Sequence, residues 1–221
     1  MPLAFSSAAF SQVVDLEITN LTHGLHFTPF FINAHDSNEH LFQVATDASA
    51  AIQAMAEGGD ISMLSSAAPQ GSVSSENPAM GLLAPSSSTE VLDLDTGNNT
   101  HLSVVSMLLP TNDGFVGLDG WEIPEEAGTY TVYLNAYDAG TEANDEIING
   151  MGASGEAGIP AAPGGDAGTG ATGVTDTEAN TTVHIHRGNV GDTDGSAGIS
   201  DVDSRIHRWL NPVAKIVVTV K

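Results

Sequence analysis

Three acidic residues follow segments that alternate in polarity, and their spacing suits a hard divalent cation. Asp113 lies in the segment TNDG, directly after one predicted strand. Asp138 and Glu142 lie in the segment DAGTE, directly after another. Ca²⁺ takes about six to eight oxygen ligands, and carboxylates four residues apart around a glycine can fold back to offer two of them. Asp and Asn also favour turns because they bond their own backbone, so this local explanation stays open beside a calcium site.

The histidines offer a second metal chemistry. His184 and His186 are two apart on a predicted strand and therefore share a face, which suits Zn²⁺ or Cu²⁺ if a third ligand such as His207 approaches. Hydrogen bonds from these rings to backbone or to nearby acids are the alternative. A second acidic loop, 191–203, resembles a calcium loop in composition, but it lacks the EF-hand order of ligands and is the weaker candidate for a further site.

Charge is distributed unevenly along the chain. There are 28 Asp and Glu against 5 Lys and Arg, for a formal net charge of −23. The five cations all follow residue 186 and are Arg187, Arg205, Arg208, Lys215 and Lys221. Nucleic acids and anionic membrane surfaces attract the opposite sign, so we predict neither as a partner. We expect the arginines to pair with acids of the same molecule, and a contact with acids of a neighbouring copy is the alternative.

Enzyme signatures are absent from the sequence. It contains no G-x-S-x-G, no H-E-x-x-H, no phosphate-binding G-x-x-x-x-G-K-[ST] and no cysteine, so we expect a non-catalytic protein. No apolar stretch reaches the roughly 18 residues that a membrane helix needs. Residues 1–12 lack the cationic region of a signal peptide, so we expect a chain that starts without one.

Most of the sequence is patterned for β-structure. Residues 13–19 alternate so that Val14, Leu16 and Ile18 share a face, and residues 129–137 alternate in the same way. Further strands are predicted at 25–32, 88–96, 101–109, 181–188 and 214–221. Pro29 makes 25–32 an edge strand or a bulge.

One helix and several connections complete the pattern. Residues 39–56 repeat apolar side chains near a period of 3.6, which predicts a helix. Strands 88–96 and 101–109 are predicted to form a hairpin. Residues 61–88 read as a long loop, and residues 149–173 read as a Gly/Ala-rich insertion.

These elements predict an all-β fold, an antiparallel β-sandwich with one short helix and long loops, in a single domain over residues 1–221. A small barrel is the alternative. The calcium site adds a topological condition. If strands 101–109 and 129–137 were direct antiparallel partners, the loops that follow them would lie at opposite ends. The chain must therefore cross back within residues 114–128.

The succession TNDGFVG, a tryptophan, YDAGTE, and then HRG and RWLNPVA resembles the spondin domain of the extracellular matrix proteins F-spondin and mindin, which also occurs in bacterial secreted proteins. The resemblance spans about residues 13–220, without the insertion at 149–173. It implies a C2-like sandwich that holds calcium through Asp113, Asp138 and Glu142. Two features depart from the animal domains: this chain has no disulfides, and Glu142 stands where those proteins often have Asp.

The resemblance implies a secreted, extracellular, calcium-binding module that acts in cell adhesion, matrix or extracellular assembly. Its partner would be an extracellular protein, a glycan or copies of itself, so a homo-oligomer or polymer is one possible state. A structural subunit of a calcium-dependent filament or tube is an alternative. A copper or zinc protein that uses His184 and His186 is another.

Overall fold

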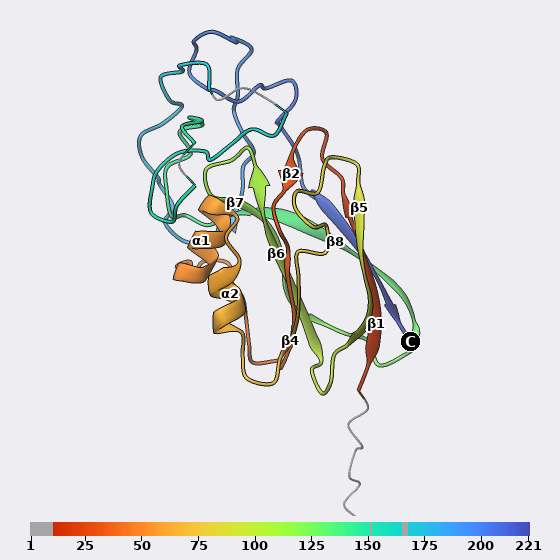
Figure 1. Ribbon diagram of the computed structural model, residues 1–221. Helices are drawn as coiled ribbons and strands as arrows, with labels where there is room; N and C mark the ends of the chain where they lie inside the picture. The colour runs from red at the N-terminus through yellow and green to blue at the C-terminus, as the bar shows by residue number, and fades with distance from the viewer. Residues whose placement is uncertain (1–10, 151, 165–167) are drawn as a thin grey trace, which may run out of the picture.

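The computed structural model describes residues 11–150, 152–164 and 168–221 (Figure 1). Its strands are β1 (Val13–Asn20), β2 (His26–Phe27), β3 (Phe31–His35), β4 (Val73–Glu76), β5 (Ser88–Asp95), β6 (His101–Leu109), β7 (Gly114–Glu122), β8 (Gly128–Asp138), β9 (His184–Ile185) and β10 (Ala214–Val220). Its helices are α1 (Ala50–Gly58) and α2 (Ser62–Ala67). The expectation for the start of the chain concerns residues 1–10, which lie outside this description.

A single antiparallel sheet forms both layers of the sandwich. Its strand order is β4-β3-β6-β7-β8-β10-β1-β5, with β2 on β6 and β9 on β8. Strand β8 joins the layers, because residues 135–138 pair with β7 whereas residues 128–134 pair with β10. Strands β4 and β5, at the two ends of this order, approach each other, so the sheet is nearly closed. The predicted all-β sandwich is confirmed, in a form that also has the character of a barrel.

The sheet buries apolar side chains on both of its faces. Alternate residues of β1, including Val14, Leu16 and Ile18, enter the core between the layers, as their period of two predicted. Strand β6 is buried almost throughout, because Val104 enters that core while Val105 packs on the other face in the cluster that includes α1. This double burial makes β6 a rigid support for the loop that follows it.

The helix predicted over 39–56 is wrong in its first half. Helix α1 begins at Ala50, where the Ser49 hydroxyl accepts a first-turn N–H. The backbone N–H groups of residues 41 and 42 instead donate to the Asp119 carboxylate at 2.7 and 3.3 Å. Ala45 has a φ of 65°, in the left-handed region that a right-handed helix excludes. A second short helix, α2, forms within 61–88, where only a loop was predicted.

The predicted hairpin of 88–96 and 101–109 is also wrong. Strand β5 pairs with β1, whereas β6 pairs with β3 and β7, so the turn at 97–99 joins two layers rather than two neighbouring strands. The predicted strand 25–32 divides around Pro29 into β2 and β3, and β3 lies inside the sheet between β4 and β6 rather than at an edge. The strand predicted at 181–188 reduces to the two residues of β9.

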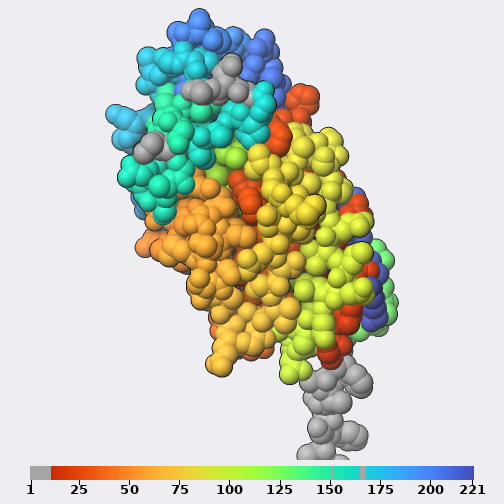
Figure 2. Space-filling model, in the orientation of Figure 1, coloured from red at the N-terminus to blue at the C-terminus, as the bar shows by residue number. Residues whose placement is uncertain are grey.

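Long irregular segments between β8 and β10 gather at one end of the sandwich. Figures 1 and 2 show them as a cap over the end where β6 finishes, beside α1. The C-terminus lies at the opposite end (Figure 1). Most of the insertion 149–173 belongs to this cap, in contact with the loop that follows β8.

Candidate functional site

A tight turn between β6 and β7 places Asp113. The Thr111 hydroxyl donates to the Leu108 carbonyl at 2.6 Å and accepts the Gly114 N–H at 3.1 Å. A side chain at Gly114 has no space, because a Cβ there would lie 2.8 Å from Thr111 Oγ1 and 3.1 Å from His186 Cδ2. The local sequence therefore holds Asp113 in a fully buried position.

Asp138 lies beside Asp113, as the topological condition required. Strand β7 is the predicted crossing, and it pairs with β8 in a register that sets Gly114 opposite Asp138. The Ala139 N–H donates to the Asp113 carbonyl oxygen at 3.2 Å. Both aspartate side chains are fully buried. Two loops far apart in sequence thus meet at the capped end of the sandwich.

The Asp113 carboxylate is satisfied on one side only. Its Oδ2 accepts the Thr141 N–H at 2.8 Å, the Thr141 hydroxyl at 3.2 Å and the Glu142 N–H at 3.4 Å. Its Oδ1 is buried and has no hydrogen-bond partner. A buried carboxylate oxygen without a partner is costly, because it has lost its hydration and gained nothing in return.

The Asp138 carboxylate faces amide donors and two imidazole rings. Its Oδ1 accepts the Gly140 N–H and its Oδ2 accepts the Asn144 Nδ2–H, each at 2.9 Å. The Nε2 atoms of His184 and His186 lie 3.7 and 3.8 Å from Oδ2. These two distances are longer than hydrogen bonds.

Glu142 connects the cluster to the insertion. Its Oε2 accepts the Gly158 N–H at 2.8 Å, whereas its Oε1 is buried without a partner. Glu57, at the end of α1, accepts the Gly155 N–H at 2.5 Å and lies close enough to repel the Glu142 charge. Residues 155 and 158 of the insertion are thus anchored through two carboxylates.

Burial disfavours the charged forms of the three carboxyl groups and raises their pKa values. Burial, with the Asp138 charge second, raises the pKa of Asp113 to about 7. Burial raises the pKa of Glu142 to about 8, although the Gly158 N–H opposes that shift. Burial also raises the pKa of Asp138, against the influence of the His184 ring. Within the described residues, no Lys or Arg forms an ion pair with any of the three.

The two histidine rings differ in what they present to Asp138. His184 Nδ1 donates to the Thr182 carbonyl oxygen at 2.8 Å, and its Nε2 is the ring nitrogen that lies towards Asp138. His186 Nδ1 accepts the Gly188 N–H at 2.9 Å, so the ring's single proton lies on Nε2. Burial lowers the pKa of His186 to about 3, and the ring is neutral. His186 therefore presents a donor rather than a metal ligand.

The residues predicted to bind zinc or copper do not form a complete ligand set. The structure brings His184 and His186 together, but His207 lines a separate cavity. Among all described residues, no three His, Asp or Glu side chains converge as a ready metal-ligand cluster. The acidic trio is included in that result: its carboxylates accept backbone N–H groups, and two of the three side chains keep a buried oxygen without a partner.

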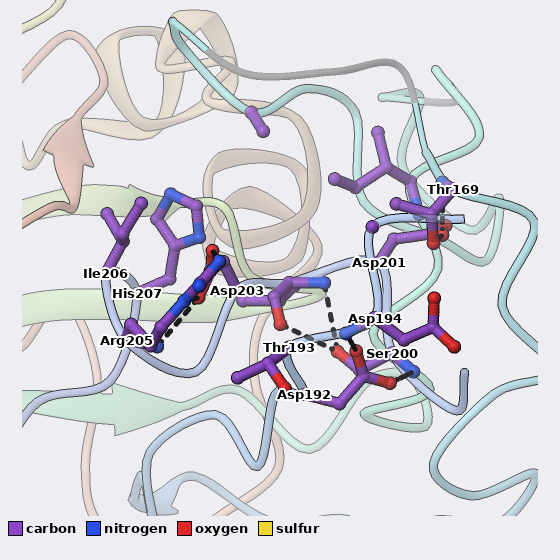
Figure 3. Close-up of a pocket in the computed structure, with 14 residues that line it drawn as sticks. Thr169, Asp192, Thr193, Asp194, Ser200, Asp201, Asp203, Arg205, Ile206 and His207 are labelled. Carbon is purple, nitrogen blue, oxygen red and sulfur yellow. Dashed lines mark hydrogen bonds and ion pairs between the residues drawn. The ribbon is translucent and has the colours of Figure 1, made fainter. Parts of the chain in front are cut away.

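The carboxylates of Asp192, Asp201 and Asp203 in the acidic loop 191–203 are engaged by backbone N–H groups or by Arg205 (Figure 3). The Asp192 carboxylate accepts three N–H groups of the loop at 2.8 to 3.0 Å. The Asp201 carboxylate accepts three backbone N–H groups and the Thr169 hydroxyl. Asp203 forms an ion pair with Arg205, with 2.6 Å between Nη2 and Oδ2. These side chains line a cavity of about 170 Å³, but they keep no buried oxygen free for a cation.

Sequence reasoning missed two amide side chains beside the trio. Asn144 donates to Asp138, and Asn112 accepts the Glu146 N–H through Oδ1 at 3.0 Å. Both lie in the segments that carry the acids, TNDG and DAGTEAN, so their position after the strand ends was the available signal. Glu57 gave no such signal, because only the packing of α1 brings it near Glu142.

The chain belongs to the spondin family. The family model described as Spondin_N matches residues 18–147, more than half of the chain, and this span includes Asp113, Asp138 and Glu142. The match confirms the predicted resemblance, and its extension over residues 148–220 stays a prediction. A comparison with curated proteins found no match. Membership of this family indicates an extracellular module of the adhesion or matrix type. Among the described residues, no helix is long and apolar enough to cross a membrane.

Proposed function

We propose that this chain is a secreted, non-catalytic adhesion or matrix module that binds Ca²⁺ through Asp113, Asp138 and Glu142. The single observation that carries the proposal is the pair of buried carboxylate oxygens without partners, Asp113 Oδ1 and Glu142 Oε1. Isolated buried charges are so costly that they are normally paired or coordinate a metal. Within the described residues, no lysine or arginine forms an ion pair with these carboxylates. A bound cation would therefore offset the cost of burying them.

The donor set fits a hard cation. Three carboxylates supply oxygen, the ligand atom that Ca²⁺ prefers, and the Asn144 side chain lies beside them with an amide oxygen of its own. Asp138 and Glu142 would turn part of their carboxylates from backbone N–H groups towards the shared ion. When bound, calcium would supply positive charge that ties the loops after β6 and β8 to each other. It would thereby rigidify the capped end of the sandwich.

Calorimetric titration with calcium tests this proposal. The chelated wild-type protein should bind calcium, whereas Asp113→Asn should show no binding, because it replaces one carboxylate oxygen with an amide nitrogen. Asp176→Asn is the matched control, since Asp176 is an exposed acid of the cap and its loss should leave binding unchanged. Calcium binding that is equal in Asp113→Asn and wild type would contradict the site.

A second candidate is a structural subunit of a calcium-dependent extracellular assembly. The observation that favours it is an exposed apolar and basic surface, in which Leu210 is 88% exposed and Arg187 and Arg208 are also exposed. The segments that carry them adjoin, because a Cβ at Gly188 would lie 3.3 Å from the Trp209 carbonyl oxygen. This surface is complementary in charge to the acidic remainder of another copy.

Light scattering with calcium and then with chelator separates the two candidates. A subunit of an assembly should grow in size with calcium and return to a monomer with chelator, and Arg208→Glu should prevent the growth. If the protein stays monomeric under both conditions, calcium-driven assembly is excluded. The remaining function is then the adhesion or matrix module that binds other partners.

A further inference from the structure

A pocket that none of the acidic trio lines lies where β7 and β8 part from each other. The two strands pair only from Gly114 to Gly117 and from Asn135 to Asp138. Before Asn135, β8 pairs with β10 instead, so the sheet forks at this point. An open pocket of about 330 Å³ occupies the fork, which is at the lower end of the range of small-ligand sites.

Aromatic rings form the walls of this fork pocket. Gly117 lines it without a side chain, and a Cβ there would lie 2.6 Å from Phe42 Cζ and 3.1 Å from Tyr137 Cδ2. The Phe42 and Tyr137 ring centroids are 4.9 Å apart. Tyr133 lies two residues before Asn135 on the same face of β8 and is 60% exposed. An exposed ring beside a buried aromatic wall is a platform on which an apolar ring face can stack.

Uncharged polar groups stand around these rings. The Gln43 side-chain amide forms no hydrogen bond within the described residues, and Asn135 lies near the Tyr137 hydroxyl. Each amide offers donors and an acceptor in one plane. Asp119, the acid that lines the pocket, is already engaged by the N–H groups of residues 41 and 42, and it fixes the wall that carries Phe42.

We propose that the fork pocket binds one sugar residue of an uncharged glycan. The apolar face of the sugar ring would stack on Tyr133, and the sugar hydroxyls would form hydrogen bonds with Gln43 and Asn135. No Lys or Arg lines the pocket, and residues 1–186 contain none. The net charge of −23 disfavours sulfated and uronic acid polymers. The pocket chemistry therefore selects neutral sugars.

This inference rests on the adhesion role proposed above but does not depend on the calcium site. Strand pairing and the Asp119 hydrogen bonds position the pocket, and none of the calcium trio lines it. Glycan binding should therefore persist in chelator wherever the protein stays folded. If the protein does not bind calcium, the glycan proposal is unaffected. If it does not bind glycans, the calcium proposal is unaffected.

A glycan array that carries uncharged, sialylated and sulfated oligosaccharides tests the proposal. The full chain should bind a subset of the uncharged glycans, and Tyr133→Ala should bind the same subset about ten-fold more weakly through loss of the stacking platform. Gln43→Ala should show a smaller loss. Thr131→Ala is the matched control, because Thr131 is exposed on the same face of β8, outside the pocket, and its loss should change nothing.

Three results would overturn the proposal. One is an array on which no uncharged glycan binds the wild-type chain. Another is equal binding by Tyr133→Ala and wild type, with circular dichroism showing that both are folded. The third is binding of sulfated or sialylated glycans as strong as that of uncharged ones, because such binding needs positive charge that the fork pocket lacks.

Discussion

Two acidic regions at the same end of this sandwich look alike in sequence and differ in chemistry. The loop 191–203 contains four aspartates, and the carboxylates of Asp192, Asp201 and Asp203 are satisfied by backbone N–H groups or by Arg205. In the trio of Asp113, Asp138 and Glu142, two carboxylates each keep a buried oxygen without a partner.

The difference teaches that full burial and an oxygen without a partner, rather than acidic composition, separate a candidate ligand from a structural carboxylate. Accepting several N–H groups stabilises the charged form of a carboxyl group, and the pKa of Asp201 is accordingly low despite a desolvation effect that raises it. Asp113 also accepts three donors through Oδ2, but its full burial and the Asp138 charge outweigh them, and its pKa rises. The Asp201 carboxylate joins segments of the cap, whereas the Asp113 carboxylate has an oxygen that could still bind an ion.

The largest expected contrast is the effect of calcium on two isosteric variants. At a calcium concentration of 100 times Kd, the wild type should gain about 2.7 kcal/mol of unfolding free energy, or roughly 5–10 °C in Tm. Asp138→Asn should lose this gain, while Asp192→Asn should keep it. Thermal unfolding with calcium and with chelator measures both. If the calcium-induced rise in Tm is lost only in Asp192→Asn, the ion binds at the loop 191–203 and not at the trio.

A second contrast concerns stability without calcium. Asp201→Asn should lower the unfolding free energy by about 1.5–3 kcal/mol, because the carboxylate accepts N–H groups from segments that are distant in sequence. Asp113→Asn in chelator should be neutral or stabilising, because it removes an uncompensated buried charge. Urea denaturation of both variants checks the signs. A strongly destabilised Asp113→Asn would show that its charge is already compensated.

The pH dependence of the chelated protein should reveal the same difference. The folded pKa values of Asp113 and Glu142, about 7 and about 8, lie above their ordinary values of 3.8 and 4.5. The unfolded chain therefore releases these protons first. Stability should be fullest below about pH 4 for these two groups and should fall as pH rises towards 8, by at most about 1.4 kcal/mol per unit for each group. Denaturation from pH 5 to 8 measures the slope, and Asp113→Asn should flatten it.

The smallest effect is expected at an exposed acid of the loop. Asp194 is exposed, and its carboxylate accepts hydrogen bonds only within its own turn, from Ser196. Asp194→Asn should change the unfolding free energy by less than about 0.5 kcal/mol and leave the calcium shift intact. Thermal unfolding with calcium and with chelator measures both effects. If the calcium-induced rise in Tm is lost in this variant, the ion binds at the loop 191–203 instead.

The juxtaposition of the acids could be predicted from the sequence further than the pairing of the strands around them. The acids follow strand ends, and the geometry of antiparallel strands required a crossing that β7 supplies. The helix over 39–56 failed because Asp119, far along the chain, captures the N–H groups of residues 41 and 42. The hairpin failed because the turn signal at 97–99 marks a reversal without saying which layer each strand joins.

The unequal satisfaction of the carboxylates could not be predicted at all. Every backbone offers N–H groups, and the sequence does not show that Asp201 receives those of residues 148, 169 and 171. It also hides the proton on His186 Nε2, which depends on an N–H from Gly188 to the other ring nitrogen. Such features arise from the folded backbone of the cap rather than from residue type.

The most direct test of the calcium site is a crystal structure of the protein grown with a calcium-like lanthanide, with the ion located by anomalous diffraction. The account predicts one strong peak bounded by Asp113, Asp138 and Glu142, with Asp113 Oδ1 and Glu142 Oε1 turned to the ion. A peak confined to the loop 191–203, or no peak at the trio under saturating lanthanide, would contradict it.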